Sequence, residues 1–345
     1  MGEGPVSLPE PRANPELVGH DTAAAALEAA ARAGRLHHAW LLAGPPGIGK
    51  ATLAYRFARW LLAGLPPPAP GQPPLHVPPG HPAFRRVAAG AHADMITLEP
   101  NRGDRGRKEL LRVEDAREAN RFLAHTAAEG GWRVVLIDEA DRADSAAFQN
   151  ILLKTLEEPP PRTVLLLVTA QPDRLLPTIR SRCRRLDLFP LEAAGMQALL
   201  AGALPDMPAA ERAALAGIAE GSPGQALALA EGEGLAMQAE VDRALAVLPA
   251  MDGRVLHAIA EAVAGRGREL DAFVTFMALL RRALTGAVRS AARGAGDVPG
   301  WVAARPLADW AAIWDRLGRL AEETERLNLD RRQAVLTGLA WLRAA

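Results

Sequence analysis

A glycine-rich heptapeptide has the residue types and spacing of a phosphate-binding loop. It reads Gly44-Pro45-Pro46-Gly47-Ile48-Gly49-Lys50 and fits the pattern G-x-x-x-x-G-K. Glycines let backbone N–H groups curl around a phosphate, the helix that follows presents its positive dipole end, and the lysine reaches the outer phosphates. A glycine-rich turn before a chance lysine is the alternative. The apolar strand pattern before the loop and the helix pattern after it favour a nucleotide-phosphate site.

The residue after the lysine departs from the usual pattern. Serine or threonine normally supplies a hydroxyl to Mg²⁺ at this position, but this chain has Ala51. Thr52 cannot substitute, because one step along a helix turns the side chain by about 100°. The sequence therefore argues against tight binding of a magnesium nucleotide, leaves weak binding of ATP or ADP open, and predicts no resident metal.

A second candidate group follows the hydrophobic run 134–137, where Asp138 and Glu139 stand side by side. In P-loop proteins an acid at this place organises the metal, and a neighbouring glutamate can polarise the attacking water. Alone, the pattern fits equally well a buried strand that ends at the surface. Downstream of a phosphate-binding loop it predicts a nucleotide site, to which we add Thr169 at the end of the next apolar run.

A third candidate is Arg182, in the phrase Ser181-Arg182-Cys183. Arginine serves at the subunit interfaces of nucleoside triphosphatases because its planar, permanently charged fork stabilises phosphate charge. An isolated phrase of this kind would indicate only a surface arginine beside a small buried thiol. Its position just after the run ending at Thr169 is what makes it a candidate.

Alternating strand and helix patterns must position these side chains. We predict buried strands at 39–44, 95–98, 132–138 and 163–169, and helices at 51–62, 113–125 and 145–156. This alternation predicts an α/β fold with a mainly parallel sheet and helices on both faces. After Leu188 only helical patterns continue, and we place domain boundaries near 189/190 and 234/235.

The segment 65–82 contains nine prolines, which are incompatible with a helix or a ladder strand. We predict an irregular surface insertion that does not contribute to the core. His76, His81 and His92 lie in or near it, but without preorganisation they do not predict a zinc site.

Composition excludes several classes of protein. Forty Lys and Arg balance forty Asp and Glu among 345 residues, so no global positive field holds the chain on nucleic acid or an anionic membrane. The local cluster Arg102, Arg105, Arg107 and Lys108 could touch DNA phosphate, although a solvated loop is the commoner explanation. A single cysteine excludes a disulfide framework or a zinc ribbon and favours the cytoplasm. No apolar run is long enough to span a membrane.

Taken together, the motifs resemble the clamp-loader subunits of the AAA+ ATPases, as found in bacterial DNA polymerase III. The resemblance covers about residues 13–230 and rests on the phosphate-binding loop, Asp138-Glu139-Ala140-Asp141, the run ending at Thr169, and Leu175-Leu176-Pro177-Thr178-Ile179-Arg180-Ser181-Arg182-Cys183. The phrases at 35–40 and 156–160 are also similar. The resemblance implies an AAA+ P-loop domain (1–189), a helical lid (190–234) and an all-α collar (235–345).

Two departures from the pattern of the motor subunits indicate which kind of subunit this chain resembles. Motor subunits carry a hydroxyl where Ala51 stands, and an arginine in a Gly-Ser-x-Arg phrase where this chain reads Gly221-Ser222-Pro223-Gly224. Many members also carry a four-cysteine zinc module, which this chain lacks. The resemblance therefore implies a non-motor subunit without ATPase activity of its own.

Such a subunit would join motor-type gamma/tau subunits and a delta subunit in a hetero-pentamer that loads the sliding clamp onto primed DNA. It would brace the ring and supply Arg182 in trans as a catalytic residue. The alternatives are an active AAA+ ATPase, either a motor-type clamp-loader subunit or a branch-migration or remodelling ATPase, and a scaffold unrelated to replication.

Overall fold

The computed structural model describes residues 8–100, 110–143, 146–264, 272–294 and 298–343. The basic cluster Arg102, Arg105, Arg107 and Lys108 lies outside these residues. The chain divides into two compact units, Met1–Gln225 and Ala226–Ala345.

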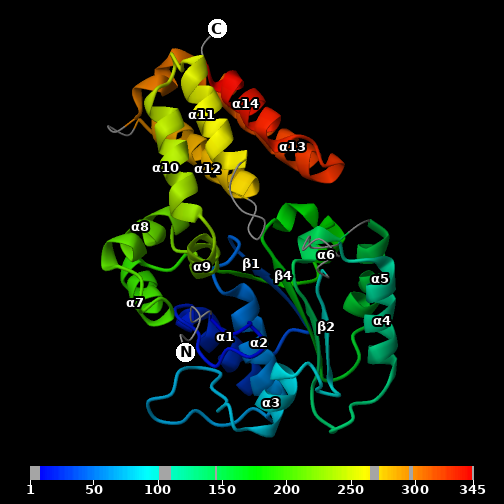
Figure 1. The fold of residues 1–345 in the computed structure, drawn as a ribbon. Coiled ribbons are helices and arrows are strands. Elements are labelled where there is room, and N and C mark those ends of the chain that lie inside the picture. The colour runs from blue at the N-terminus through cyan, green and yellow to red at the C-terminus, as the bar shows by residue number, and fades with distance from the viewer. Residues whose placement is uncertain (1–7, 101–109, 144–145, 265–271, 295–297, 344–345) are drawn as a thin grey trace. The chain divides into compact units, whose positions relative to one another are not determined.

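The first unit is built on one sheet of five parallel strands (Figure 1). In spatial order these are β2 (Met95–Leu98), β3 (Arg133–Ile137), β4 (Thr163–Thr169), β1 (Ala39–Ala43) and β5 (Arg184–Asp187). This confirms the predicted α/β class and four predicted strands. The fifth, β5, is not predicted, because its residues are mostly charged and exposed and form no apolar run.

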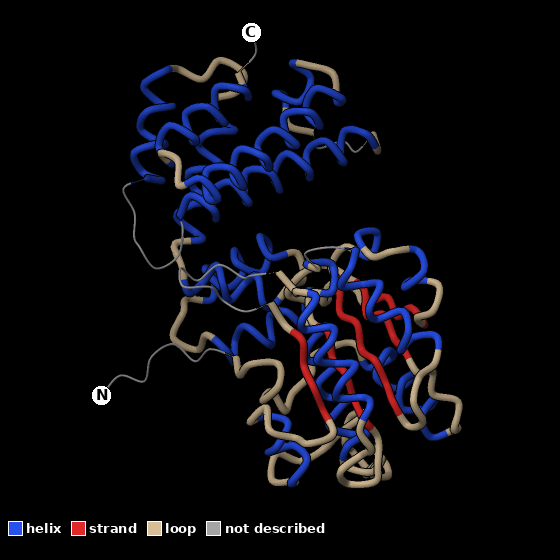
Figure 2. The backbone as a smooth tube through the Cα atoms, turned by 90° about the vertical axis from the view of Figure 1, so that its right-hand side faces the viewer, coloured by secondary structure: helices blue, strands red, loops and turns tan. Residues whose placement is uncertain are grey.

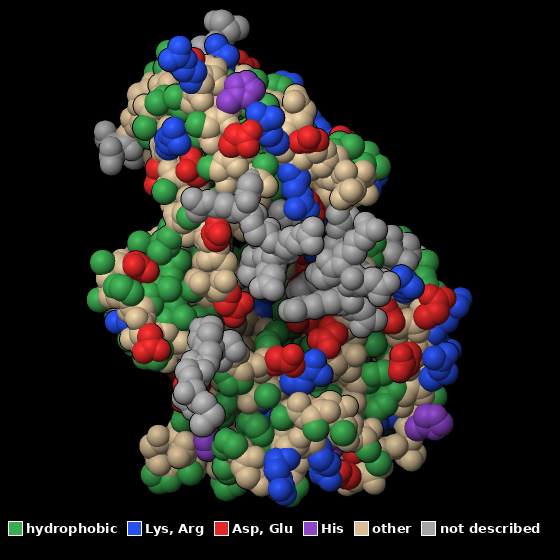
Figure 3. Space-filling view, viewed as in Figure 1, with side chains coloured by type: hydrophobic (Ala, Val, Ile, Leu, Met, Phe, Trp, Pro, Cys, Tyr) green, Lys and Arg blue, Asp and Glu red, His purple; other side chains and the backbone are tan. Residues whose placement is uncertain are grey.

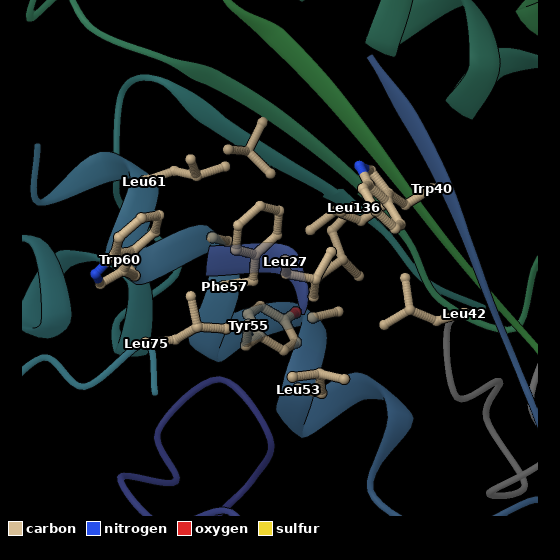
Figure 4. Packing of buried hydrophobic residues seen from close by; sticks show 14 of the residues in the cluster. Leu27, Trp40, Leu42, Leu53, Tyr55, Phe57, Trp60, Leu61, Leu75 and Leu136 are labelled. Carbon is tan, nitrogen blue, oxygen red and sulfur yellow. The ribbon is translucent and has the colours of Figure 1, made fainter. Parts of the chain in front are cut away.

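Successive residues of the central strands contribute to two different cores. In β1, Trp40 and Leu42 belong to one hydrophobic cluster, whereas Ala39 and Leu41 belong to another on the opposite face of the sheet. This is the period-two alternation of a strand that is buried on both faces. Figure 4 shows the first cluster, in which Trp40 and Leu42 meet side chains of the helices.

Helices cover both faces of this sheet, as Figure 2 shows. The first cluster includes side chains from α1 (Asp21–Arg32), α2 (Lys50–Leu62) and α3 (Pro82–Ala88). The second includes side chains from α4 (Val113–Ala124), α5 (Ala146–Glu157) and the short α6 (Pro177–Arg180). Two 3₁₀ turns, η1 (Ala140–Arg142) and η2 (Pro172–Arg174), follow β3 and β4.

Helical segments complete the first unit after the sheet. They are α7 (Ala193–Ala203), α8 (Ala209–Ala219) and the beginning of α9 (Pro223–Glu231). Hydrophobic side chains gather on the visible surface of α7 and α8 (Figure 3). After Asp187 the described residues contain helices and no strand, in agreement with the sequence.

The structure corrects the interpretation of the proline-rich segment 65–82. Its backbone is irregular up to α3, as predicted, but the segment is part of the core. Leu75 and Val77 are buried in the first hydrophobic cluster, and the carbonyl of Pro66 accepts a hydrogen bond from Trp60 Nε1 at 3.2 Å. Proline prevents regular backbone pairing, but it does not prevent a loop from inserting apolar side chains between helices.

The three histidines of this region, in the part of the chain that the structure describes, are not grouped to bind one metal ion. His81 caps α3, because its Nδ1 accepts from the backbone N–H of Ala83 at 3.2 Å, and His92 Nδ1 accepts from the N–H of Asp94 at the same distance. In the part of the chain that the structure describes, no three His, Cys, Asp or Glu side chains are grouped to hold a metal.

The regular secondary structure in the described residues of the second unit is entirely helical. Its elements are α10 (Gly234–Ala246), α11 (Gly253–Ala264), α12 (Ala272–Ala292), η3 (Gly300–Ala304), α13 (Leu307–Leu327) and α14 (Arg331–Leu342). Trp301 and Trp310 are buried in an edge-to-face pair, and Trp310 Nε1 donates to the carbonyl of Val302 at 3.0 Å. None of the helices in the described ranges could cross a lipid bilayer, because none combines the necessary length and apolarity.

Candidate functional site

The phosphate-binding loop connects β1 to α2, as the sequence predicts, and its glycines are required by close packing. Gly44 and Gly47 have φ values of +159° and +73°. A Cβ at Gly44 would lie 2.4 Å from the carbonyl oxygen of Leu188, and one at Gly47 would lie 2.5 Å from Ser222 Oγ. No larger residue fits either position without movement of its neighbours.

Segments remote in the sequence bind the carbonyl groups of the loop. The carbonyl of Pro46 accepts from Ser222 Oγ at 2.9 Å, and that of Gly47 accepts from the N–H of Gly224 at 2.9 Å. His20 Nε2 donates to the carbonyl of Ile48 at 2.7 Å, because a carbonyl oxygen can only accept. Contacts from residues at the starts of α1 and α9 therefore hold the loop in place.

Lys50 is turned back onto its own loop. Its Nζ donates to the carbonyls of Gly44 at 2.8 Å and Pro45 at 2.6 Å, and the residue is buried. Burial lowers the pKa of Lys50 from its ordinary value. The opposite influence comes from nearby carboxylates, which raise that pKa in the order Asp138, Asp141 and Glu139. The ammonium thus has both hydrogen-bond acceptors and compensating charge within the protein.

A pocket of about 1090 Å³ opens beside the loop, entirely within the first unit. Most of the predicted site residues line it: Pro46, Gly47, Ile48, Gly49, Lys50, Ala51, Thr52, Asp138, Glu139 and Thr169. Gly44, Pro45 and Arg182 are not among the lining residues. The structure therefore brings the phosphate-binding loop together with the acidic pair and Thr169, and it places the third candidate, Arg182, elsewhere.

Sequence reasoning did not identify several other lining residues. Arg142 and Arg174 bring positive charge to the wall of the pocket, and the N-terminal segment contributes residues between Leu8 and Val18. No motif marks these residues, because each belongs to an irregular segment or a 3₁₀ turn. Arg142 forms an ion pair with Glu139 at 3.5 Å.

Two buried arginines of α2 hold the N-terminal segment at the pocket. Arg56 Nη1 donates to the carbonyl of Pro15 at 2.9 Å, and Arg59 Nη2 donates to that of Asn14 at 2.7 Å. Burial, and to a smaller extent the charge of Arg56, lower the pKa of Arg59 to about 10. Backbone carbonyls thus stabilise two guanidinium groups that the apolar core would otherwise exclude.

The hydroxyl of Thr169 is already engaged. Thr169 Oγ1 donates to Asp141 Oδ1 at 2.7 Å, and this carboxylate oxygen also accepts from the N–H of Ala170 at 3.0 Å. Asp138 Oδ1 accepts from the N–H of Glu139 at 2.9 Å. The acidic turn after β3 is therefore tied to the end of β4 by hydrogen bonds within the protein.

The donor set fits a magnesium nucleotide poorly. Ala51 lines the pocket at the start of α2 and offers no oxygen to a metal. The lysine that would reach the outer phosphates donates to two loop carbonyls instead. Gly224, at the place of a lid arginine, packs so closely that an added Cβ would lie 3.0 Å from Gly47 Cα. We therefore derive no catalytic step through bound Mg-ATP in this chain.

Arg182 is not among the residues that line the pocket and lies in the turn that follows α6. Its Nη2 forms an ion pair with Glu157 Oε1 at 2.8 Å, and its Nη1 donates to the carbonyl of Thr178 at 3.1 Å. The side chain is 36% exposed. The adjacent Cys183 packs against the second hydrophobic cluster, and burial raises the pKa of its thiol to about 12. A partly buried cysteine thus anchors the chain beside a partly exposed arginine.

In the first unit, the phosphate-binding loop connects a central parallel strand to a helix, and a helical segment after the sheet packs against the loop. These features define the unit as a P-loop α/β module of the AAA+ kind. Residues 19–192 match the family model described as DNA polymerase III, delta subunit. The chain is 42% identical over 187 residues to the DNA polymerase III subunit delta′ of Pseudomonas aeruginosa, and 39% identical over 221 residues to that of Escherichia coli K12. The chain belongs to the delta-prime family of DNA polymerase III subunits.

These matches cover 54% and 64% of this chain, and 53% and 62% of the two relatives. The chain therefore matches between half and two thirds of their length. Among solved structures, a gamma subunit-related DNA polymerase III protein from Thermotoga maritima is 17% identical. It aligns over 92% of this chain and 98% of its own, with a TM-score of 0.48.

Proposed function

We propose that this chain is the non-motor subunit of a bacterial clamp loader and acts in trans. It joins motor-type gamma/tau subunits and a delta subunit in a cytoplasmic hetero-pentamer that loads the sliding clamp onto primed DNA. In this assembly residues 1–189 form the AAA+ domain, 190–234 the lid and 235–345 the collar. Membership in the delta-prime family supports the proposal.

The placement of Arg182 is the observation that carries it. The guanidinium does not line the pocket of its own subunit, yet it is held partly exposed beside a well-anchored turn. A permanently charged planar fork at such a position can stabilise the phosphate charge that develops in a neighbouring subunit's site. The chain thus supplies one catalytic group to a partner while its own pocket remains inactive.

Reconstitution with the motor and delta subunits tests this proposal. Arg182→Ala should leave assembly and thermal stability near wild type, and should lower the ATPase activity that DNA and clamp stimulate. Arg182→Lys should rescue poorly, because a point charge on a flexible stem lacks the planar fork. A complex of Arg182→Ala that keeps the wild-type ATPase and clamp-loading rates would refute the trans role.

An active ATPase is the second candidate, favoured by the pocket in which Lys50, Asp138 and Glu139 meet. The purified chain should hydrolyse Mg-ATP at a negligible rate, because Ala51 offers no metal ligand. Turnover of about one per second, the low end of ordinary enzymes, that Lys50→Ala abolishes would establish this second function instead.

A further inference from the structure

Glu157 and Arg182 come from different elements that meet at one end of the first unit. Glu157 is the last residue of α5, and Arg182 follows α6. Arg182 Nη2 lies 2.8 Å from Glu157 Oε1, and Arg182 Nη1 donates to the carbonyl of Thr178 at 3.1 Å. The guanidinium carries five N–H donors, so two such contacts leave others available for a phosphate.

Hydrogen bonds fix both the end of α5 and the segment that precedes Arg182. The end of α5 is fixed because Leu156 is buried and its carbonyl accepts from His38 Nε2 at 3.0 Å. The segment before Arg182 is fixed by Gln149 of α5, which is 7% exposed. Its side-chain amide donates to the carbonyl of Arg174 at 3.3 Å and accepts from the N–H of Leu176 at 2.7 Å.

Stability does not account for an acidic residue at this position. The C-terminal end of a helix carries negative partial charge, so Glu157 is electrostatically unfavourable for α5 itself. An ion pair between partly exposed side chains also contributes little to the stability of a fold. Its main physical effect is to restrict the rotamers of a long, flexible side chain.

We propose that Glu157 is a positioning residue that orients the Arg182 guanidinium toward a phosphate bound by the neighbouring subunit. The proposal rests on the proposed trans function of Arg182. Ordering the side chain before the subunits meet reduces the entropy lost when the guanidinium engages phosphate. Glu157 itself touches neither nucleotide nor metal, so its effect passes entirely through Arg182.

The test uses the reconstituted complex and the Arg182-dependent ATPase rate, defined as the wild-type rate minus the Arg182→Ala rate. Glu157→Gln removes the charge and keeps the size of the side chain. It should lower the Arg182-dependent rate by about three- to tenfold, less than the ~10²-fold that a 1 Å displacement can cost. The KM for ATP should change less than kcat, because the nucleotide sits in the partner. In the Arg182→Ala background, Glu157→Gln should change nothing further.

Asp173→Asn provides a matched control. Asp173 forms an ion pair with Arg180 in the same segment, and the Asp173 side chain is exposed to solvent. Its removal should change the Arg182-dependent rate by less than about twofold. Melting temperature and assembly of each variant are measured on the same preparations.

The outcomes separate the two proposals. If Arg182→Ala leaves the rate unchanged, the trans function fails and the positioning role fails with it. If Arg182→Ala lowers the rate but Glu157→Gln raises it, or changes it no more than Asp173→Asn does, only the positioning role is overturned. A loss that persists undiminished in the Arg182→Ala background would also overturn it, because Glu157 would then act by another route.

Discussion

Leu75 offers a direct test of whether the proline-rich segment belongs to the core. Its side chain is 1% exposed and lies in the cluster with Phe57 and Trp60 (Figure 4), and its N–H donates to Glu28 Oε2 at 3.1 Å. Truncating a buried leucine to alanine costs about 2 to 5 kcal/mol of unfolding free energy. For a unit of 225 residues this lowers the melting temperature by roughly 4 to 20 °C.

The backbone of Leu75 allows a sharper version of this test. Its φ is +58°, a left-handed conformation that costs an L-residue about 1 to 2 kcal/mol and glycine little. Leu75→Gly should therefore be no less stable than Leu75→Ala, although glycine removes one more carbon from the core. Scanning calorimetry of the full chain measures both midpoints, with the exposed Gln72→Ala as control.

Two results would refute this reasoning. If Leu75→Ala shifts the midpoint no more than Gln72→Ala does, the segment is dispensable and the structural correction is wrong. Leu75→Gly could instead be less stable than Leu75→Ala by about 1 kcal/mol or more, which is the entropic cost of glycine in a helix or strand. That result would show that the left-handed conformation is not costly for alanine at this position.

Three further predictions concern the pocket and the anchored turn. Ala51→Thr should strengthen nucleotide binding in the presence of Mg²⁺ only, which titration calorimetry with and without the metal would detect; it should restore little hydrolysis. An equal gain without Mg²⁺ would contradict the missing-ligand explanation. Gly224→Ala should destabilise the chain by about 1 to 3 kcal/mol, because its Cβ would press on Gly47 at 3.0 Å; an unchanged denaturant midpoint would refute this. The Cys183 thiol should react with iodoacetamide at pH 8 far more slowly in the folded chain than in urea, because burial raises its pKa to about 12 and keeps it protonated. Equal rates would show that the Cys183 thiol is accessible to solvent in the folded chain.

The sequence predicts the central sheet well because its strands are buried on both faces. Val134 to Ile137 and Thr163 to Thr169 form apolar runs that only a fully covered strand can accommodate. The edge strand β5 gives no such signal, since its charged residues need no cover on one side. The phosphate-binding loop, the acidic pair after β3 and Thr169 meet at the pocket because the parallel strands β1, β3 and β4 end at the same edge of the sheet.

Other features depend on contacts that no local pattern encodes. The burial of Leu75 depends on the space between α1 and α2, and proline content gives no information about that space. The motif marks Arg182, but its partner Glu157 is a helix-terminal acid like many others. Likewise, the bond from Gly224 to Gly47 joins positions 177 residues apart in the sequence.

The packing of the phosphate-binding loop also affects how its mutational tolerance should be interpreted. Leu188 and Ser222 leave no space for a side chain at Gly44 or Gly47. A deep mutational scan that selects only for folded protein should therefore find both glycines intolerant, whether or not any nucleotide ever binds. In this chain the sequence signature of an ATP site is also a folding requirement. Its persistence among variants would therefore report selection for architecture. The same holds for Lys50, which is buried and donates to two loop carbonyls, so substitutions at Ala51 are the ones that could report selection for a ligand.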